Sequence, residues 1–497
     1  MAQYVMGIDQ STQGTKVLLF DSAGKVAHQL ACAHKQYIDD NGWVEHDPEE
    51  IWQNLKKLVK DIMQENNLTG EDIVAIGISN QRETALAWNK STGESIYPAI
   101  VWQCARGAKI CNEIEAKGFK DLIKQNTGLT LSPYFSAAKL AWIMQNVPEA
   151  KTLAESGNLC MGTVDSWLLH KMTNGEVFKT DYSNASRTQL FNINSLKWDE
   201  EICQLFGVPL NALAEVTFSD SFFGKTTIGG ALNSEVPIYS VLGDSHAALF
   251  GQGCHSAGLT KATYGTGSSI MMNTGDNLIK NDQGLATTIA YGMNNKINYA
   301  LEGNINYTGA GITWLKDDVE LIKSAAETEQ LAKESNPADK TYFVPAFTGL
   351  GAPYYDEHAT GIFTGMTRVT GKKEIVRAVV DSIAYQIYDV VHLMEKISNT
   401  EIRGLQVDGG PTKNSYLMQF QSDILNKHVE VPPIAELSAM GVAYCAGIAT
   451  GFYDKKAVFN GLSWKQYDAN MDEQKRKNLL EGWRLAIKKS MSKQSNS

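Results

Sequence analysis

The chain has 497 residues, of which 43% are hydrophobic and 20% are charged, and its formal net charge at pH 7 is −10. A chain of this length exceeds a single hydrophobic core, so we expect two or three domains. The negative charge argues against a general nucleic-acid binder. No apolar stretch approaches the roughly 20 residues of a membrane span. Seven scattered cysteines without a metal-binding spacing indicate a reduced, cytoplasmic protein.

The chain begins with a predicted hairpin. An apolar strand over 4–9 ends in Asp9, a short polar turn follows, and a second strand covers 16–21. Backbone N–H groups and hydroxyls in such a turn can hold an anion, and Lys16 adds a positive charge. Asp9 is placed to hold a metal ion at the end of its strand. The pattern favours a phosphate-and-magnesium site, while an ordinary hairpin with a polar turn explains this segment equally well.

Strands and helices then alternate along the chain. Asp47 is a predicted helix cap, Pro48 occupies the first helical position, and apolar residues recur at helical spacing after it. The predicted elements after the hairpin are a helix over about 48–65, a strand over 73–79, strands over 286–291 and 297–301, a helix from 374, a strand over 405–408 and a helix from Asn414. This alternation predicts α/β sheets. Glycines near 250–260 indicate a boundary, so we expect domains over 1–252 and 253–497, hinged around a central cleft.

Five turns that follow predicted strands carry glycine or acidic residues. They cover 9–16, Gln81–Thr84, Gly243–His246, Tyr264–Gly267 and Val407–Gly410. Glycine lets a backbone approach a phosphate closely, and Gly410 with its neighbour offers a flat surface for a purine whose edge Asn414 could contact. One such turn is weak evidence, because glycine pairs usually mark turns alone. Five of them in two α/β halves favour a nucleotide-binding cleft.

Two long motifs, Tyr134–Asn146 and Gly361–Asp381, resemble the signatures of the FGGY carbohydrate kinase family. Further segments resemble the glycerol kinases within that family, namely Gly42–Pro48, Asn80–Thr84, Ile100–Cys104, Asn184–Thr188 and Phe347–Tyr354. The resemblance extends from about residue 4 to 490. It implies a two-domain ribonuclease H-like/actin-like ATPase fold of the hexokinase/actin superfamily, with a central cleft.

The resemblance also implies an ATP-dependent phosphotransferase that acts on the hydroxyl of a small polyol or ketose and requires Mg²⁺. By position it gives the nucleotide-binding residues as Thr12, Gln13, Lys16, Thr266, Gly309, Thr313, Gly410 and Asn414. It gives the acceptor-binding residues as Arg82, Glu83, Trp102, Tyr134, Asp244, Ser245 and Ser269. Asp244 would be the base that takes the hydroxyl proton, and Asp9 and Asp244 would hold Mg²⁺. Arg82 would offer a donor fork and Glu83 an acceptor to adjacent hydroxyls, although adjacent charges usually form a surface pair.

Two departures from the glycerol kinase pattern predict a larger acceptor. Ser245 stands where that pattern has glutamine, and Ser269 stands where it has phenylalanine. The smaller side chains would leave room and two hydroxyls, so we expect a tetritol, a pentitol or a ketopentose such as xylulose, with glycerol as the alternative. An actin-like ATPase without a small acceptor is a distant alternative, because Arg82, Glu83 and Tyr134 would have no purpose there. The resemblance further implies a homodimer or homotetramer, with no nucleic-acid or membrane partner.

Overall fold

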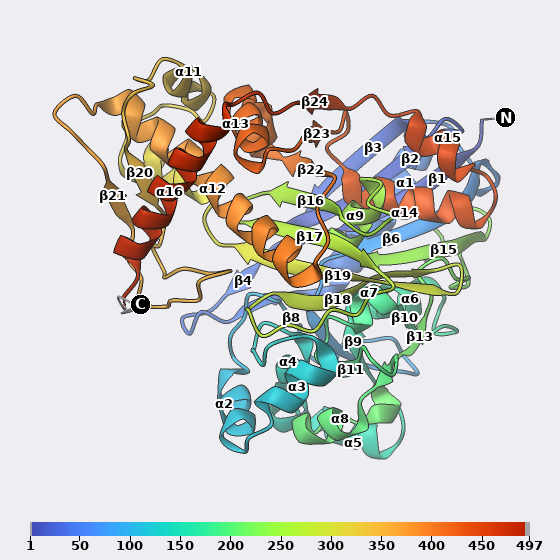
Figure 1. Ribbon diagram of the computed structural model, residues 1–497. Coiled ribbons are helices and arrows are strands. Elements are labelled where there is room, and N and C mark those ends of the chain that lie inside the picture. The colour runs from blue at the N-terminus through green and yellow to red at the C-terminus, as the bar shows by residue number, and fades with distance from the viewer. Residues whose placement is uncertain (1, 493–497) are drawn as a thin grey trace.

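Two mixed β-sheets form the frame of the molecule, described for residues 2–492 by a computed structural model (Figure 1). The first sheet has the strand order β14-β15-β6-β1-β2-β3. Its strands are β1 (Tyr4–Gln10), β2 (Gly14–Phe20), β3 (Val26–Ala33), β6 (Ile73–Asn80), β14 (Lys225–Thr226) and β15 (Val236–Gly243). The β1–β2 pair is the predicted antiparallel hairpin, and β6 runs parallel to β1 and to β15. The ends of β1, β6 and β15 therefore meet at one edge of the sheet.

The second sheet has the order β18-β19-β17-β16-β22-β23-β24. Its strands are β16 (Leu259–Tyr264), β17 (Ser268–Gly275), β18 (Ala286–Met293), β19 (Lys296–Ile305), β22 (Gly404–Gly409), β23 (Val429–Val431) and β24 (Lys465–Tyr467). Strands β16 and β22 are parallel, with Tyr264 opposite Gly409. The glycine-containing turns after these two strands consequently lie side by side.

Helices α9 (Asp244–Gly251) and α14 (Leu437–Ala449) pack between the two sheets. The fit against the first sheet is close, because a Cβ on Gly77 would lie 2.3 Å from the backbone oxygen of Val442 in α14. The opposite face of the first sheet packs against α1 (Pro48–Glu65) and α6 (Val164–Met172). Asp47 caps α1 by accepting a hydrogen bond from the N–H of Glu49, as its sequence predicts.

A smaller sheet and a group of helices form the lobe at the lower end of Figure 1. The sheet has the order β4-β5-β8-β7-β9, with β4 (Tyr37–Ile38), β5 (Val44–His46), β7 (Ala85–Asn89), β8 (Ala99–Ile100) and β9 (Leu159–Thr163). The helices are α2 (Ala108–Ala116), α3 (Lys120–Thr127), α4 (Ser136–Asn146), α5 (Pro148–Glu155) and α8 (Glu200–Phe206). Short elements join this lobe to the sheets: β10 (Lys179–Asp181), α7 (Tyr182–Ala185), β11 (Phe191–Asn192), β12 (Lys197–Trp198) and β13 (Glu215–Thr217).

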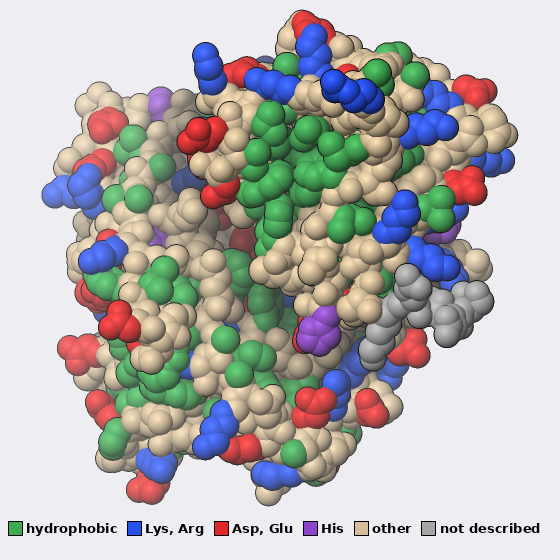
Figure 2. Space-filling view, turned by 90° about the vertical axis from the view of Figure 1, so that its left-hand side faces the viewer, with side chains coloured by type: hydrophobic (Ala, Val, Ile, Leu, Met, Phe, Trp, Pro, Cys, Tyr) green, Lys and Arg blue, Asp and Glu red, His purple; other side chains and the backbone are tan. Residues whose placement is uncertain are grey.

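The outer face of the second sheet is covered by the long helix α12 (Lys372–Ser398), with α13 (Ser415–Leu425) and α16 (Glu473–Ser490) beside it. The remaining elements on this side are α10 (Gly309–Thr313), α11 (Glu327–Lys333), β20 (Tyr342–Val344), β21 (Ile362–Thr364) and α15 (Lys455–Asn460). Apolar side chains gather on one face of the molecule (Figure 2). Phe347, Met366 and Val369, which follow β20 and β21, are exposed.

The structure confirms the strands and helices that the sequence predicts in both halves of the chain. The predicted helix from 374 is α12, which begins two residues earlier. The domain boundary between 252 and 253 stays a prediction, and α14, which lies beyond it, packs against the first sheet. Within residues 2–492, none of the helices has both the length and the apolar character that crossing a membrane requires.

Candidate active site

Two arginines and two glutamates form a buried cluster between the two sheets. Arg82, just after β6, donates from Nη1 and Nη2 to the two carboxylate oxygens of Glu302 at 3.2 and 3.0 Å. Arg187 Nη1 lies 2.7 Å from Glu302, and Arg187 Nε donates to Glu83 at 2.6 Å. Arg82 Nε lies 3.1 Å from the Asp244 carboxylate. Arg82 and Glu83 are only 6% and 2% exposed, so the alternative of a surface pair is wrong.

The charges of this cluster hold one another in their ionised forms. Burial alone would raise the pKa of the Glu302 carboxyl, but the guanidinium groups of Arg187 and Arg82 outweigh burial and hold that pKa well below its usual range. The reverse effect raises the pKa of Arg82, because Glu302, Glu83 and Asp244 outweigh its burial. Glu302 belongs to β19 of the second sheet, whereas both arginines precede that sheet in the chain. Arg82 is thus fixed by a carboxylate from the second sheet.

Glu83 has a left-handed backbone conformation, with φ of +60°. A residue with a side chain adopts this conformation at a cost of about 1–3 kcal/mol, and such residues concentrate at functional sites. Its neighbours keep it there: Arg187 binds the side chain, and Ser136 Oγ donates to the backbone oxygen at 3.1 Å. The strained turn directs Arg82 and Glu83 toward the same buried cluster.

Trp102 and Tyr134 line an open cavity of about 370 Å³, and the Tyr134 phenol lies within electrostatic reach of the arginines and glutamates of the cluster. Their rings meet edge to face with centroids 5.5 Å apart. Trp102 Nε1 donates to Thr12 Oγ1 at 2.9 Å, so this wall of the cavity is tied to the turn of the first hairpin. The cavity is lined by Trp102, Gln103, Cys104, Ala105, Ser132, Pro133 and Tyr134. Its size lies within the range of small-molecule sites.

Asp9 and Asp244 lie near each other at the ends of β1 and β15. Burial and, to a lesser extent, the negative charge of Asp244 raise the pKa of Asp9 to about 7, although Ser79 Oγ donates to Asp9 at 3.0 Å and opposes the shift. No group of three or more metal-ligating side chains occurs among residues 2–492. Mg²⁺ is commonly held by one or two carboxylates together with water and substrate phosphates, so this pair fits Mg²⁺.

The turn between β1 and β2 carries the predicted phosphate-binding residues. Lys16 Nζ lies 2.6 Å from the carboxylate of Glu436, the residue before α14. The positive charge of Lys16 is therefore paired with a negative charge from a distant part of the chain. Gln13 is exposed, and its backbone oxygen accepts a hydrogen bond from the N–H of His34 at 3.2 Å. Thr12 is half-buried and accepts from Trp102. The hairpin therefore contacts both Trp102 and the residue that precedes α14.

Thr266 and Gly309 lie in two segments that bind each other. The N–H groups of Gly309 and Ala310 donate to the backbone oxygens of Gly265 and Thr266 at 2.9 and 3.0 Å. A Cβ on Gly309 would lie 2.7 Å from the backbone oxygen of Gly265, so this approach requires glycine. The side chain of Thr266 remains exposed, as does Thr313 at the end of α10. The segments leave an exposed polar surface at the end of β16.

Gly410 and Asn414 follow β22 beside that surface. Gly410 is exposed, and nothing lies within 4 Å of the position that a Cβ would take. Asn414 caps α13 by accepting from the N–H of Leu417 at 3.0 Å, and its Nδ2 donates to Thr328 at 3.1 Å. The backbone at Gly410 is thus open to a flat ligand, and the Asn414 side chain is held in place beside it.

The buried cluster engages Ser269, one of the two serines that predicted a larger acceptor. Ser269 Oγ donates to Glu302 Oε1 at 3.2 Å. The Ser245 N–H lies 2.6 Å from the Asp244 carboxylate, which fixes the start of α9. The Ser269 hydroxyl is therefore engaged by the arginine–glutamate cluster, and this contact removes it as a free donor for an additional acceptor hydroxyl.

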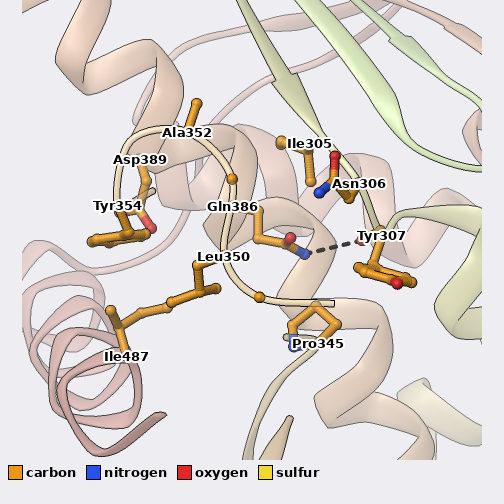
Figure 3. A pocket seen from close by; sticks show the side chains of 12 residues that line it. Ile305, Asn306, Tyr307, Pro345, Leu350, Ala352, Tyr354, Gln386, Asp389 and Ile487 are labelled. Atoms are coloured by element: carbon orange, nitrogen blue, oxygen red, sulfur yellow. Dashed lines mark hydrogen bonds between the residues drawn. The ribbon is translucent and has the colours of Figure 1, made fainter. Parts of the chain in front are cut away.

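A second cavity lies at the end of β19 and is shown in Figure 3. The loop over 345–354, α12 and α16 enclose it, and Gln386 Nε2 donates to the Tyr307 backbone oxygen at 3.2 Å. Its volume is only about 20 Å³, which is room for a single water. The cavity borders the segment before Gly309 and is too small for a substrate.

Glu302 and Arg187 are the residues of the cluster that sequence reasoning did not assign. Arg187 lies within a segment that resembles the glycerol kinases, and Glu302 interrupts the apolar strand β19. A charged residue flanked by buried strand positions usually has a buried partner. That signal indicates that Glu302 has a partner. It does not identify the partner as Arg82, which is 220 positions away in the sequence.

The chain matches the N-terminal domain of the FGGY family of carbohydrate kinases over residues 4–251 and the C-terminal domain of that family over residues 260–450. The chain belongs to this family. "Glycerol kinase 1" of Clostridium tetani is 45% identical over 494 residues, 99% of each chain. The glycerol kinase of Treponema denticola is 46% identical over 496 residues, again 99% of each chain. This FGGY protein is an ATP-using phosphotransferase with an alcohol group as acceptor.

Solved structures give the same relationship. A glycerol kinase of Plasmodium falciparum, solved with ADP, has a TM-score of 0.94 at 35% identity, covering 99% of each chain. A xylulose kinase of Lactobacillus acidophilus has a TM-score of 0.87 at 21% identity, covering 98% of each chain, a likeness of fold alone. The predicted two-domain fold class is confirmed. The expectation of an acceptor larger than glycerol is wrong: the relatives at about 45% identity over the whole chain are glycerol kinases, and the Ser269 hydroxyl that motivated it binds Glu302.

Proposed function

We propose that this FGGY protein is a glycerol kinase, which transfers the γ-phosphoryl group of ATP to glycerol and yields glycerol 3-phosphate. Identity of 45% to a glycerol kinase over 99% of both chains supports this acceptor. The structural observation that carries the proposal is the contact of 3.1 Å between Arg82 Nε and the Asp244 carboxylate. It supports a base and a donor fork at one site, and the Tyr134 phenol, which lies within electrostatic reach of Arg82, also lines the cavity of about 370 Å³.

Asp244 acts in this proposal as the general base. Its carboxylate takes the proton of the attacking hydroxyl, a contribution of typically about 10²–10⁴-fold. Arg82 orients that carboxylate through Nε and uses two further N–H groups on Glu302. A guanidinium has five N–H donors, so two remain for acceptor hydroxyls. The indole of Trp102 and the ring of Tyr134 contact the carbon backbone of the acceptor.

The nucleotide occupies the exposed surface between the hairpin and the ends of β16 and β22. Thr12, Gln13, Lys16 and Thr266 contact its phosphates, and Gly309, Thr313, Gly410 and Asn414 contact the nucleoside. Asp9 and Asp244 hold Mg²⁺, which neutralises charge on the phosphate oxygens when it is bound. The hydrogen bond from Trp102 to Thr12 joins the acceptor wall to the phosphate turn. Phosphoryl transfer depends mainly on such positioning, because the protein does little covalent chemistry.

The protein works in the cytoplasm as a homodimer or homotetramer in this proposal, without a nucleic-acid or membrane partner. Seven free cysteines accord with a reducing compartment. The exposed Phe347, Met366 and Val369 are side chains that a subunit interface would bury. Light scattering coupled to size-exclusion chromatography measures the mass, and a monomer at micromolar concentration would contradict the assembly.

The test of the acceptor is a coupled ADP-release assay over glycerol, tetritols, pentitols and xylulose. We expect the highest kcat/KM with glycerol. A tetritol, pentitol or ketose that exceeds glycerol by a wide margin would refute the proposal. ADP release that is equally fast without any acceptor would instead indicate an ATPase.

A further inference from the structure

Lys139 is a fully buried lysine in α4, the helix that opens the first FGGY signature. Its Nζ donates to three successive backbone oxygens, those of Pro133 at 2.8 Å, of Tyr134, and of Phe135 at 3.1 Å. An ammonium group has three N–H donors. All three are therefore used, which compensates the cost of burying the charge.

The three oxygens belong to the segment that carries the acceptor wall. Ser132, Pro133 and Tyr134 line the cavity of about 370 Å³ together with Trp102. The segment lies outside the helices and strands, between α3 and α4. Its other polar ties include the N–H of Tyr134 donating to Ser132 Oγ at 3.2 Å and Gln189 Nε2 donating to the Thr130 backbone oxygen at 2.8 Å. Three carbonyls that converge on one ammonium fix the backbone orientation here, and with it the direction of the Tyr134 ring.

We propose that Lys139 is a positioning residue for the acceptor site: its ammonium holds the Pro133–Phe135 backbone so that Tyr134 faces Trp102 and the Arg82–Glu302 cluster. The proposal rests on the proposed function insofar as Tyr134 contacts the acceptor. Lys139 touches neither substrate in this arrangement and acts only through the Tyr134 segment. A purely structural role in packing α4 is the alternative that the experiment must separate from it.

Burial on one side, and the nearby carboxylate and backbone carbonyls on the other, act in opposite directions on the charge of Lys139. Burial lowers the pKa of Lys139 to about 7, whereas the Glu83 carboxylate favours the ammonium form. The three carbonyl dipoles favour that form as well, because a neutral amine has one donor fewer and would direct a lone pair at an oxygen. Methionine, which is similar in length, would remove all three donors and leave three backbone oxygens unpaired.

The experiment compares Lys139→Met with Leu140→Ala, a matched control at the next position of the same helix. Leu140 is also fully buried but lies in the apolar core of the lobe, so its truncation weakens packing and leaves the ammonium in place. Assays use whichever alcohol the wild type phosphorylates best. We expect Lys139→Met to raise the acceptor KM by about tenfold or more, the equivalent of a lost charge-assisted hydrogen bond, with the ATP KM nearly unchanged. We expect faster amide exchange over residues 129–136 in the same variant.

Leu140→Ala should lower the thermal midpoint while the acceptor KM and the exchange of residues 129–136 stay near wild type. Lys139→Gln, which keeps two donors on a shorter side chain, should give an intermediate acceptor KM and supplies the test if the methionine variant does not fold. A wild-type acceptor KM in either Lys139 variant would overturn the inference. Tyr134→Ala separates the two levels: if it raises the acceptor KM and the Lys139 variants do not, only this inference fails. If Tyr134→Ala also has no effect, the proposed acceptor site fails with it.

Discussion

Replacing Glu302 with glutamine tests the buried arginine–glutamate cluster most directly. The side chain of Glu302 is fully buried and contacts Arg82, Arg187 and Ser269. Glutamine preserves its size but removes the charge, which leaves two buried guanidinium groups with one fewer carboxylate between them. Breaking a buried ion pair by removing one partner costs about 3–5 kcal/mol. We expect Glu302→Gln to lower the free energy of unfolding by about that amount, and to raise the acceptor KM because Arg82 loses its support.

The assay is urea unfolding followed by fluorescence, with Glu473→Gln as the control. Glu473 also binds an arginine fork, with Arg476 donating at 2.8 and 2.9 Å, but on the exposed surface of α16. Solvent screens such a pair, so the control should show no resolvable change in midpoint. Equal losses in the two variants would refute the reasoning, because burial would then not distinguish the two pairs.

The pH dependence gives a second measurement on the same variant. The folded-state pKa of Glu302 lies below its ordinary value of 4.5, so the carboxylate stabilises the protein fully above about pH 4.5. That contribution declines as the pH falls below this value toward the folded-state pKa. The difference in stability between wild type and Glu302→Gln should therefore be constant from pH 6 to 8 and shrink in acid. A difference that persists unchanged at pH 3 would contradict the proposed ion pairs.

Three further variants test the roles of single residues. Asp244→Asn should lower turnover by about 10²–10⁴-fold because an amide cannot take the hydroxyl proton, while calorimetry shows that ATP still binds. Near-normal turnover would remove Asp244 as the base. Arg82→Ala should raise the acceptor KM far more than the ATP KM in steady-state assays, because the proposed function assigns its two remaining N–H groups to acceptor hydroxyls. The opposite pattern would mean that the pocket is misplaced. Ser269→Ala should lower the free energy of unfolding by about 1.5–3 kcal/mol, the usual contribution of a hydrogen bond to a charged group; an unchanged urea midpoint would show that the Glu302 contact contributes nothing.

The parts of the fold that could be predicted from the sequence are those with local signals. Helix α1 has a capping aspartate, a proline at its first position and an apolar stripe, and the first hairpin has two apolar strands around a polar turn. Helix α14 has no such signal, because ten of its thirteen residues are buried. A helix that packs on two sides lacks a polar face and therefore the helical period on which prediction depends.

The candidate site shows the same division. Residues in turns after strands, such as Asp9, Arg82 and Thr266, could be proposed because polar groups at strand ends gather at one edge of a sheet. Glu302 lies within a strand, and its significance depends on Arg82, whose position relative to β19 is fixed only by tertiary packing. Sequence reasoning finds such a partner only when pairing between distant segments is known.

The error about the acceptor has a specific physical cause. Ser269 is smaller than the phenylalanine of the glycerol kinase pattern, and the expectation took account of this difference in side-chain volume. It did not take account of the group that the Ser269 hydroxyl binds. In the structure that group is Glu302, which also binds the fork of Arg82. Glu302 and Ser269 belong to the second sheet, whereas Arg82 follows β6 of the first. Any movement of one sheet against the other would therefore change the geometry of Arg82 and Asp244 together. Under the proposed function, the positions of the acceptor and of the nucleotide thus depend on one arrangement of the two halves. A single side-chain difference at the edge of that arrangement does not by itself define a larger pocket.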